Sequence, residues 1–347
     1  MSATMSDPKS LPTVDAHGHL VPGELVELLR AGQHGIKSIM VTPDDDGIER
    51  WYVGTDSEGR PFQIRPFPKI LSDVDERLLW MDAQGIDVQC VSTWGELHGY
   101  HLDPTECSRW SRLTNQYLLT AVADEERLRP FATIPLGSPE LAAAEMKWAA
   151  SVGFSGVMCG VHSGTLPLDD QAYTILWEEA SNSGLVVYLH PDYPYWNERL
   201  RGELLAGSLG RAMDTATAVA RLITSGVFHR YPSLKVVASH GGGGLPFLWG
   251  RLRHCMRLAS SEYLTESMPP GLYFDSVVHD PTTLGCLVDE VGADHLILGS
   301  DYPFPLLDPR PVDTVREGVA GRGESVLEAI LATNTARLFV PRTSIVV

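Results

Sequence analysis

The sequence has few basic residues and no long hydrophobic run. Its 347 residues contain 27 lysines and arginines against 44 aspartates and glutamates, which gives a formal net charge of −17. This charge argues against nucleic acid or an anionic membrane as a partner, because both attract basic protein surfaces. No segment approaches the roughly 20 apolar residues that cross a bilayer. A small anionic substrate is still compatible with this charge, because a few buried arginines could bind it.

The chain also lacks closely spaced cysteines and a secretory leader. Its five cysteines include no C-x-x-C pair, which favours reduced, buried thiols. The first residues, MSATMSDPKSLPT, have no basic start followed by an apolar stretch. We therefore expect a cytoplasmic protein. With 44% hydrophobic and 20% charged residues, the chain can build a large core.

Short apolar segments alternate with helical patterns through most of the chain. Near-continuous apolar strands indicate burial on both faces, and therefore a parallel sheet. Eight such repeats predict one domain over residues 1–347, an α/β protein with a TIM-like (β/α)8 barrel. The alternative is an open doubly wound sheet. We favour the barrel because all its strands end at one mouth. The expected strands are 13–20, 86–93, 129–136, 155–161, 185–191, 234–244, 271–278 and 295–301.

Residues 21–80 interrupt this alternation. GELVELLRAG predicts a short helix, and IERWYVGTDSEGRPFQIRP predicts two strands around a Ser-Glu-Gly turn. A helical pattern with Leu78, Leu79 and Met81 follows and ends at Gly85. We expect residues 21–80 to form an inserted cap over the site, made of a short helix and a β-hairpin.

Four of the expected strands end in residues that commonly bind metals. His17 and His19 are two apart on a strand, so their side chains share a face and could hold one ion. His190 follows the fifth strand, His240 the sixth and Asp301 the eighth. A lone histidine at a strand end is more often a core residue. Five such residues at one barrel mouth predict a site for zinc or another divalent ion.

These motifs resemble those of a known family. D-x-H-x-H, H-P, S-H-G-G-G and G-S-D-Y-P-F-P are similar to motifs of the amidohydrolase superfamily. The narrower resemblance is to its decarboxylase branch, which includes the 2-amino-3-carboxymuconate 6-semialdehyde decarboxylases. It extends through ITSGVFHRYPSLKVVASHGGG and DSVVHDPTTLGCLVDEVGADHLILGSDYPFP. The resemblance implies a metal-dependent enzyme built on a barrel.

The resemblance also implies roles for individual residues. His17, His19, His190 and Asp301 would ligate one divalent ion together with a water, with Zn²⁺ as the expected ion and Mn²⁺ as the alternative. His240 would be the acid/base beside that water, and Asp301 a second proton carrier. The fourth strand, SGVMCGV, has no lysine whose carbamate could bridge two ions. This absence supports a mononuclear site.

Two arginines are implied as ligands for the carboxylate of the substrate. Arg65 lies in F-Q-I-R-P-F, and Arg251 follows His240 by eleven residues. In the family the second arginine reaches the neighbouring subunit's site, which implies a homodimer. Arginine suits bidentate carboxylate capture, although a hairpin salt bridge and a helix-surface charge are the alternatives from the residues alone. His162 and Trp196 are expected to line the pocket.

One loop departs from the family pattern. Members typically read His-Pro-Trp-Asp after the fifth strand, whereas this chain reads HPDYPYW from His190 to Trp196. The identity of the substrate therefore stays open. His98 and His101 follow the second strand, and we expect them to be exposed loop histidines, although such a loop could also reach the mouth.

We predict a carbon–carbon lyase that decarboxylates an aromatic or unsaturated, muconate-semialdehyde-like acid without oxidation. The metal would act as electron sink, and His240 or Asp301 would return a proton to carbon. The alternative is a metal-dependent hydrolase or hydratase that attacks an ester, lactone, amide or activated double bond. A non-catalytic metal-stabilised scaffold is a third possibility, but structural zinc sites are usually closed by cysteines.

Overall fold

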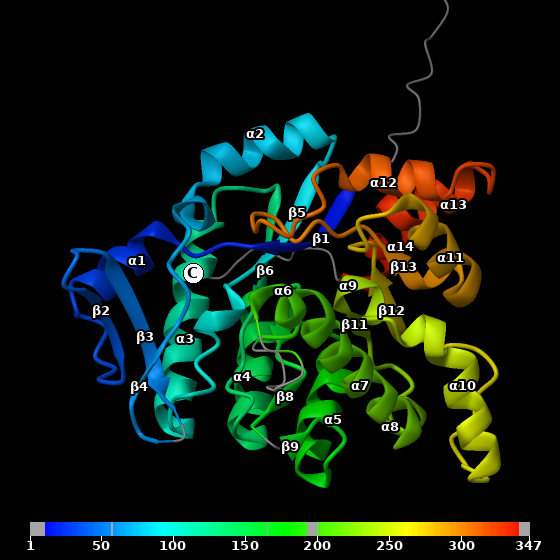
Figure 1. Ribbon diagram of the computed structural model, residues 1–347, viewed down its shortest axis with the longest axis horizontal. Helices are drawn as coiled ribbons and strands as arrows, with labels where there is room; N and C mark the ends of the chain where they lie inside the picture. The colour runs from blue at the N-terminus through cyan, green and yellow to red at the C-terminus, as the bar shows by residue number, and fades with distance from the viewer. Residues whose placement is uncertain (1–10, 57, 165, 193–199, 201, 340–347) are drawn as a thin grey trace, which may run out of the picture.

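An eight-stranded parallel sheet forms the centre of the molecule (Figure 1). The computed structural model describes residues 11–56, 58–164, 166–192, 200 and 202–339. All eight strands fall within the segments expected from the sequence, or within one residue of them, and most are shorter. In sheet order they are β1 (Val14–His19), β5 (Val88–Ser92), β6 (Leu128–Ala132), β7 (Gly156–Cys159), β10 (Val186–Leu189), β11 (Val236–Ala238), β12 (Leu272–Asp275) and β13 (Leu296–Ile297).

Hydrogen bonds between the first and last strands close the sheet. The Ala16 amide donates to the Leu298 carbonyl at 2.9 Å, and the Asp301 amide donates to the His17 carbonyl at 2.9 Å. A parallel bridge also joins Gly18 to Tyr302. The (β/α)8 barrel is therefore confirmed in preference to an open sheet. Closure brings the carboxyl ends of β1 and β13 side by side.

The barrel strands are buried on both faces. In β10, Val186 and Tyr188 belong to one hydrophobic cluster, whereas Val187 and Leu189 belong to another. Because successive strand residues point to opposite faces, one cluster fills the barrel and the other packs under the surrounding helices. This two-sided burial explains the nearly continuous apolar runs in the sequence.

Helices connect the strands and cover the outside of the barrel (Figure 1). Local signals set their ends: α2 begins after Asp73, which accepts a bond from the Glu76 amide, and stops at Gly85 with φ 70°. Helix α12 was not expected from the sequence. The helices are α2 (Val74–Gln84), α3 (Pro104–Ala121), α4 (Pro139–Val152), α5 (Thr174–Ser183), α6 (Glu203–Leu205), α7 (Arg211–Thr224), α8 (Val227–Arg230), α9 (Ser239–Gly242), α10 (Leu245–Leu258), α11 (Pro281–Val291), α12 (Pro311–Gly318), α13 (Glu324–Glu328) and α14 (Asn334–Leu338).

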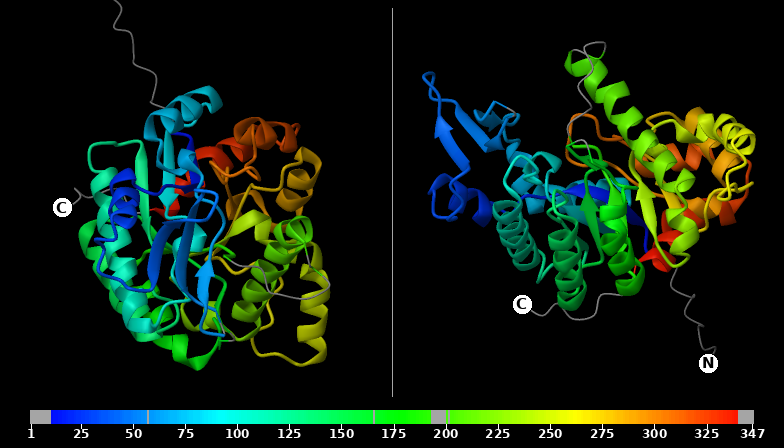
Figure 2. Two further views of the ribbon diagram at one scale, coloured as in Figure 1. Left: turned by 60° about the vertical axis from the view of Figure 1, so that its left-hand side comes forward. Right: turned by 90° about the horizontal axis from the view of Figure 1, so that it is seen from below.

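The segment between β1 and α2 forms a helix and a small sheet. Helix α1 (Gly23–Arg30) precedes an antiparallel sheet of β2 (Ile39–Pro43), β3 (Glu49–Thr55) and β4 (Pro61–Gln63). The helix and the β3–β4 hairpin match the expectation, but β2 adds a third strand. Figure 2 shows this sheet standing out to one side of the barrel. The hydrophobic cluster of this segment includes Trp94, which follows β5, so the segment packs against the barrel mouth.

Within the described ranges, none of the helices has the length and apolar character needed to cross a membrane.

Candidate metal centre

Four side chains that could bind a metal meet at the carboxyl ends of the strands. His17, His19, His190 and Asp301 are buried, and their ligand atoms all lie within 4.8 Å of one another. The Nε2 atoms of His17 and His19 are 3.3 Å apart, and they lie 3.4 and 3.2 Å from Asp301 Oδ1. Residues from β1, from the end of β10 and from the loop after β13 are thus brought together, as barrel closure requires.

Several buried polar atoms of this group have no hydrogen-bond partner, and a bound cation would be a partner for them. Among the described residues, Nδ1 and Nε2 of His190 and Oδ1 of Asp301 have no hydrogen-bond partner. A buried polar atom without a partner costs on the order of 1–3 kcal/mol. Three imidazoles and one carboxylate are a donor set that divalent transition ions accept. The residues therefore fit a single divalent ion.

Hydrogen bonds fix the orientation of the two β1 histidines. His17 Nδ1 lies 2.8 Å from Asp275 Oδ2, and His19 Nδ1 lies 3.1 Å from the Thr93 carbonyl oxygen. Nδ1 is the donor in both contacts, because a carboxylate and a carbonyl only accept. This tautomer leaves Nε2 of each ring with a free lone pair directed at the centre.

Asp275 is a residue that the sequence analysis missed. It ends β12 and is fully buried. Its Oδ2 also accepts the Tyr188 hydroxyl at 2.7 Å, and its Oδ1 accepts the Gly241 amide at 2.9 Å. Its position at a strand's carboxyl end was the signal that could have identified it.

The charge states of the ligands favour a cation. Burial lowers the pKa of His19 and holds the pKa of His190 well below its usual value. Burial also acts to lower the pKa of His17, but Asp301 and Asp275 outweigh it and raise that pKa. Burial acts to raise the pKa of Asp301, yet the surrounding imidazoles, His17 first, hold it well below its usual range. An ionised carboxylate beside neutral His19 and His190 is ready to bind a metal.

Asp15, the aspartate of D-x-H-x-H, holds the Asp301 loop in place. It accepts bonds from the Ser300 amide at 3.0 Å and from the Ser300 hydroxyl, and Gln89 Nε2 donates to it at 2.7 Å. Buried Arg77 then donates to the Gln89 side chain and to the His19 carbonyl. This network joins β1, β5 and the end of β13 directly beneath the ligands.

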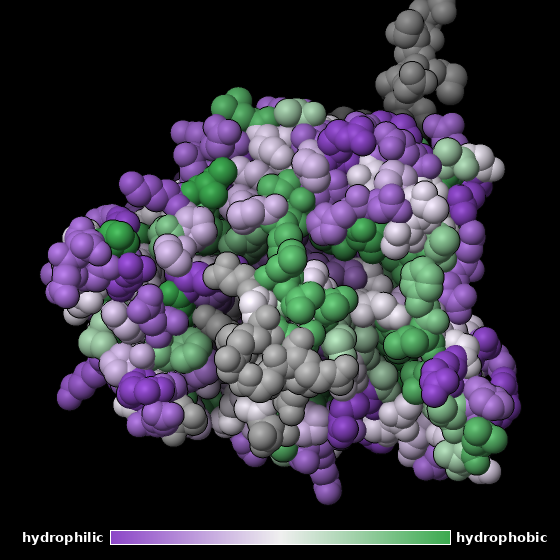
Figure 3. All heavy atoms as spheres, viewed as in Figure 1, coloured by the Kyte–Doolittle hydropathy of each residue, from purple (hydrophilic) through white to green (hydrophobic). Residues whose placement is uncertain are grey.

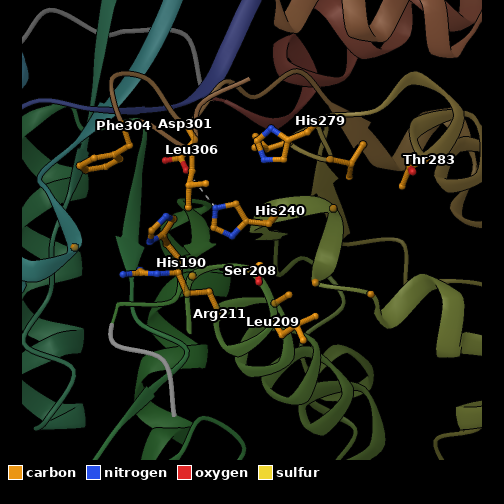
Figure 4. A pocket seen from close by; sticks show the side chains of 18 of the residues that line it. His190, Ser208, Leu209, Arg211, His240, His279, Thr283, Asp301, Phe304 and Leu306 are labelled. Atoms are coloured by element: carbon orange, nitrogen blue, oxygen red, sulfur yellow. Dashed lines mark ion pairs between the residues drawn. The ribbon is translucent and has the colours of Figure 1, made fainter. Parts of the chain in front are cut away.

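His240 lies beside the four ligands on the open side of the site. Its Nε2 is 3.5 Å from Asp301 Oδ2, and its side chain is 19% exposed (Figure 4). Its φ of 54° is a strained, left-handed conformation of the kind that gathers at functional sites. Gly243 must be glycine, because a Cβ there would lie 1.9 Å from the Ala212 carbonyl oxygen. The SHGGGG turn thus directs His240 into the cavity.

A cavity of about 590 Å³ opens in front of His190, His240 and Asp301. Its volume suits a small molecule. Most of its wall is apolar, and two arginines interrupt that wall. The apolar side chains include Trp94, Leu209, Pro246, Phe247, Val277, Phe304 and Leu306, and the arginines are Arg65 and Arg211.

Arg65 lines this cavity and is also paired with a carboxylate. Its Nε donates to Glu96, and its backbone amide donates to Glu96 Oε2 at 2.8 Å. The Glu96 side chain is 2% exposed, whereas that of Arg65 is 51% exposed. The sequence left two alternatives for Arg65, a substrate-binding residue or a member of a salt bridge. In the structure Arg65 both lines the cavity and forms a salt bridge.

The other proposed substrate residues lie elsewhere. Arg251 is exposed on α10 and does not line the cavity of its own chain. His162 lies in the two-residue strand β8 (His162–Ser163), which pairs with β9 (Leu166–Pro167), and it does not line the cavity either. Trp196 falls outside the described residues.

The expectation for the second-strand histidines was wrong for one of them. His101 is exposed, but His98 is buried, and its Nδ1 lies 2.8 Å from Asp192 Oδ1. Asp192 stands where the family pattern has tryptophan. The contact appears only in the fold, because the two residues are far apart in the sequence.

Comparisons with known proteins agree with the site. A model of the amidohydrolase family matches residues 14–340. The 2-amino-3-carboxymuconate-6-semialdehyde decarboxylase of Dictyostelium discoideum is 28% identical over 275 residues, which cover 76% of this chain and 75% of that protein. The structure of 5-carboxyvanillate decarboxylase from Sphingomonas paucimobilis matches with a TM-score of 0.75 and 25% identity, covering 95% of this chain and 99% of that one. A dihydroxybenzoic acid decarboxylase from Polaromonas sp. JS666, solved with manganese and the inhibitor 2-nitroresorcinol, matches with a TM-score of 0.72 and 24% identity over 94% of this chain and 96% of that one.

Proposed function

Because the chain belongs to the amidohydrolase family, we propose that it is a metal-dependent, non-oxidative decarboxylase of an aromatic or unsaturated carboxylic acid. The observation that carries this proposal is the convergence of His17, His19, His190 and Asp301 at the floor of an arginine-containing cavity. Relatives named as decarboxylases of such acids favour this activity over hydrolysis or hydration.

The residues of the cavity can carry out each part of this reaction. His17, His19, His190 and Asp301 would hold a divalent ion, which would supply Lewis acidity toward the substrate. Arg65, with Arg251 of a neighbouring copy, would hold and orient the carboxylate, and the apolar wall excludes water. When the bond to the carboxylate breaks, carbon dioxide leaves and the electron pair stays on the carbon that carried the carboxylate.

That carbon must then receive a proton. His240 faces the cavity and lies 3.5 Å from Asp301 Oδ2. It can hold a proton at Nε2 and deliver it to the carbon, with Asp301 as the second proton carrier. Both are therefore assigned as catalytic residues, while His17, His19 and His190 serve as metal ligands only.

Zn²⁺ is the proposed ion, and Mn²⁺ is the alternative. Imidazole and carboxylate donors accept either ion. The manganese bound in the Polaromonas enzyme supports the alternative. Metal analysis of protein expressed without added metal distinguishes the two.

The enzyme is also proposed to be a cytoplasmic homodimer in which Arg251 reaches the neighbouring site. Phe247 and Leu248, which precede Arg251 on α10, are 74% and 54% exposed. Figure 3 shows hydrophobic side chains gathered on this face, in the middle and along the side where α10 lies in Figure 1. Exposed apolar patches of this kind mark association surfaces. None of the five cysteines forms a disulfide, as expected, but the expectation of burial was wrong for Cys255 and Cys286, which are exposed.

Roles are also proposed for residues around the barrel mouth that do not bind the metal. Residues 21–80 are proposed to cap the barrel within a single domain, because their hydrophobic cluster includes Trp94 and has Phe304 packed against it, and both residues line the cavity. Trp196, which falls outside the described residues, is proposed to contact the substrate, whereas His162 does not line the cavity and could do so only in a substrate complex that differs from this structure.

The test is an assay for carbon dioxide with metal-loaded protein. The panel contains hydroxybenzoates, 5-carboxyvanillate and a carboxymuconate semialdehyde, together with aryl esters and lactones. Release of carbon dioxide from an acid supports the proposal. Cleavage of esters or lactones without any release of carbon dioxide would support the hydrolase instead.

A further inference from the structure

Arg211 places a cationic side chain in the cavity from within the same chain. It is the first residue of α7, and its side chain extends beside His190 (Figure 4). Its Nη1 donates to the Pro191 carbonyl oxygen at 2.8 Å. Among the described residues, no carboxylate forms an ion pair with it. Toward the part of the chain that the structure describes, the guanidinium uses only its Nη1 donor, so its other donors can bind a ligand.

The electrostatic setting of Arg211 differs from that of Arg65. Arg65 pairs with Glu96 and is half exposed, so its charge is largely compensated before any substrate binds. Burial lowers the pKa of Arg211 and the nearby charge of Arg65 lowers it further, while the carboxylates of Glu96, Asp192 and Asp301 offset part of this lowering without forming an ion pair with Arg211. A buried cation without a paired anion is unfavourable. An anionic ligand would reduce that penalty, so this part of the cavity favours a negative group.

The surroundings of Arg211 indicate the chemical class of that ligand. Figure 4 shows His190 beside Arg211, and Asp301 lines the same cavity, so a group that touches Arg211 also approaches the metal site. The apolar side chains of Phe304 and Leu306 also line this cavity and suit a planar ring. A carboxylate attached to a ring satisfies both requirements.

We propose that Arg211 is a substrate-binding residue that holds the carboxylate of an aromatic acid in its own subunit's cavity. This inference rests on the proposed function and adds to it a carboxylate ligand that does not depend on a partner subunit. Arginine presents a planar fork that matches a carboxylate in two-point contact. The bond to Pro191 uses one end of the fork and fixes its position.

The experiment compares charged and neutral probes on metal-loaded protein. Calorimetry would measure binding of 2,6-dihydroxybenzoate and benzoate, and of resorcinol, which has the same ring without the carboxylate. Arg211→Met removes the charge and keeps the length of the chain. Arg221→Met is the matched control, because Arg221 lies on the same helix and pairs with Asp169 on the surface.

We expect Arg211→Met to weaken binding of the acids by about tenfold or more, and binding of resorcinol by less than about twofold. Arg211→Lys keeps the charge without the fork and should give an intermediate loss. It also tests the proposal if Arg211→Met does not fold. Arg221→Met should bind every probe as the wild type does, with equal metal content.

Three results would overturn the inference. One is unchanged acid binding in both Arg211 variants. The second is equal loss of acid and resorcinol, because Arg211 would then only fix the Pro191 loop. The third is a wild-type protein that binds neither acid at millimolar concentration. Failure of the proposed function is a separate outcome, since acids could bind through Arg211 in a protein that releases no carbon dioxide.

Discussion

The carboxylate of Asp275 lies 2.8 Å from Nδ1 of His17 and thereby decides which nitrogen of that ring can bind a metal. Replacing Asp275 with asparagine keeps the size of the side chain but offers an amide that can donate to Nδ1 and favour the wrong tautomer. We expect metal affinity to fall by about 10–100-fold. Competition with a chelator measures this loss.

Asp294→Asn serves as the matched control for Asp275→Asn, because Asp294 is exposed and lies outside the site. It should bind metal as the wild type does. Equal affinities in wild type and Asp275→Asn would show that Asp275 does not orient His17.

Removal of the metal should lower the stability of the fold. Four buried side chains lose their common partner, and an ion that binds only the native state stabilises it by about 2.7 kcal/mol at 100 times its Kd. Thermal unfolding with and without a chelator measures the difference. In Asp301→Asn, which lacks the ligand carboxylate, chelator should leave the midpoint nearly unchanged. A wild-type midpoint that does not respond to chelator would contradict a bound native ion.

His240 should affect catalysis and leave metal binding intact. Asparagine is the informative replacement, because it tolerates the left-handed backbone that His240 adopts at φ 54°. Loss of the acid/base group should slow carbon dioxide release by about 10²–10⁴-fold. Single-turnover kinetics and metal analysis on the same sample separate the two effects. Loss of metal together with activity would instead make His240 a ligand.

A mixing experiment tests whether Arg251 acts across a dimer. His240→Asn and Arg251→Met should each be nearly inactive alone. If Arg251 serves the neighbouring site, each mixed dimer contains one complete site, so random reassortment should restore roughly a quarter of wild-type activity. Activity that stays at the level of the separate variants would mean that Arg251 acts in its own subunit or not at all.

The barrel and the meeting of the proposed metal-binding residues at its mouth were predictable, because the strands and the residues that end them can be recognised in the local sequence. The apolar strands define the fold. Barrel geometry then places His17, His190 and Asp301 at one mouth, independently of the conformation of the loops. The small strand β2 and helix α12 were missed because IMVTP and PVDTVREG are short segments, too short for a periodic pattern to stand out from the flanking loops.

Other parts of the site could not be inferred in this way, because they depend on contacts between distant segments. Arg211 lies in a long helical region where an arginine is normally a surface charge, and only the packing of α7 turns it toward His190. The contact between His98 and Asp192 joins two loops whose approach no periodic pattern encodes. Loops carry much of the specificity in this type of fold, which is why the substrate was harder to predict than the chemistry.

The most direct test of a mononuclear metal-dependent decarboxylase is a titration of metal-free protein with Zn²⁺ or Mn²⁺. Labelled carbon dioxide would be measured from an acid that carries the label in its carboxyl group. The account predicts no release without metal and a linear rise that stops at one ion per subunit. Release from metal-free protein, a requirement for two ions, or no release from any acid of the panel with fully loaded protein would contradict it.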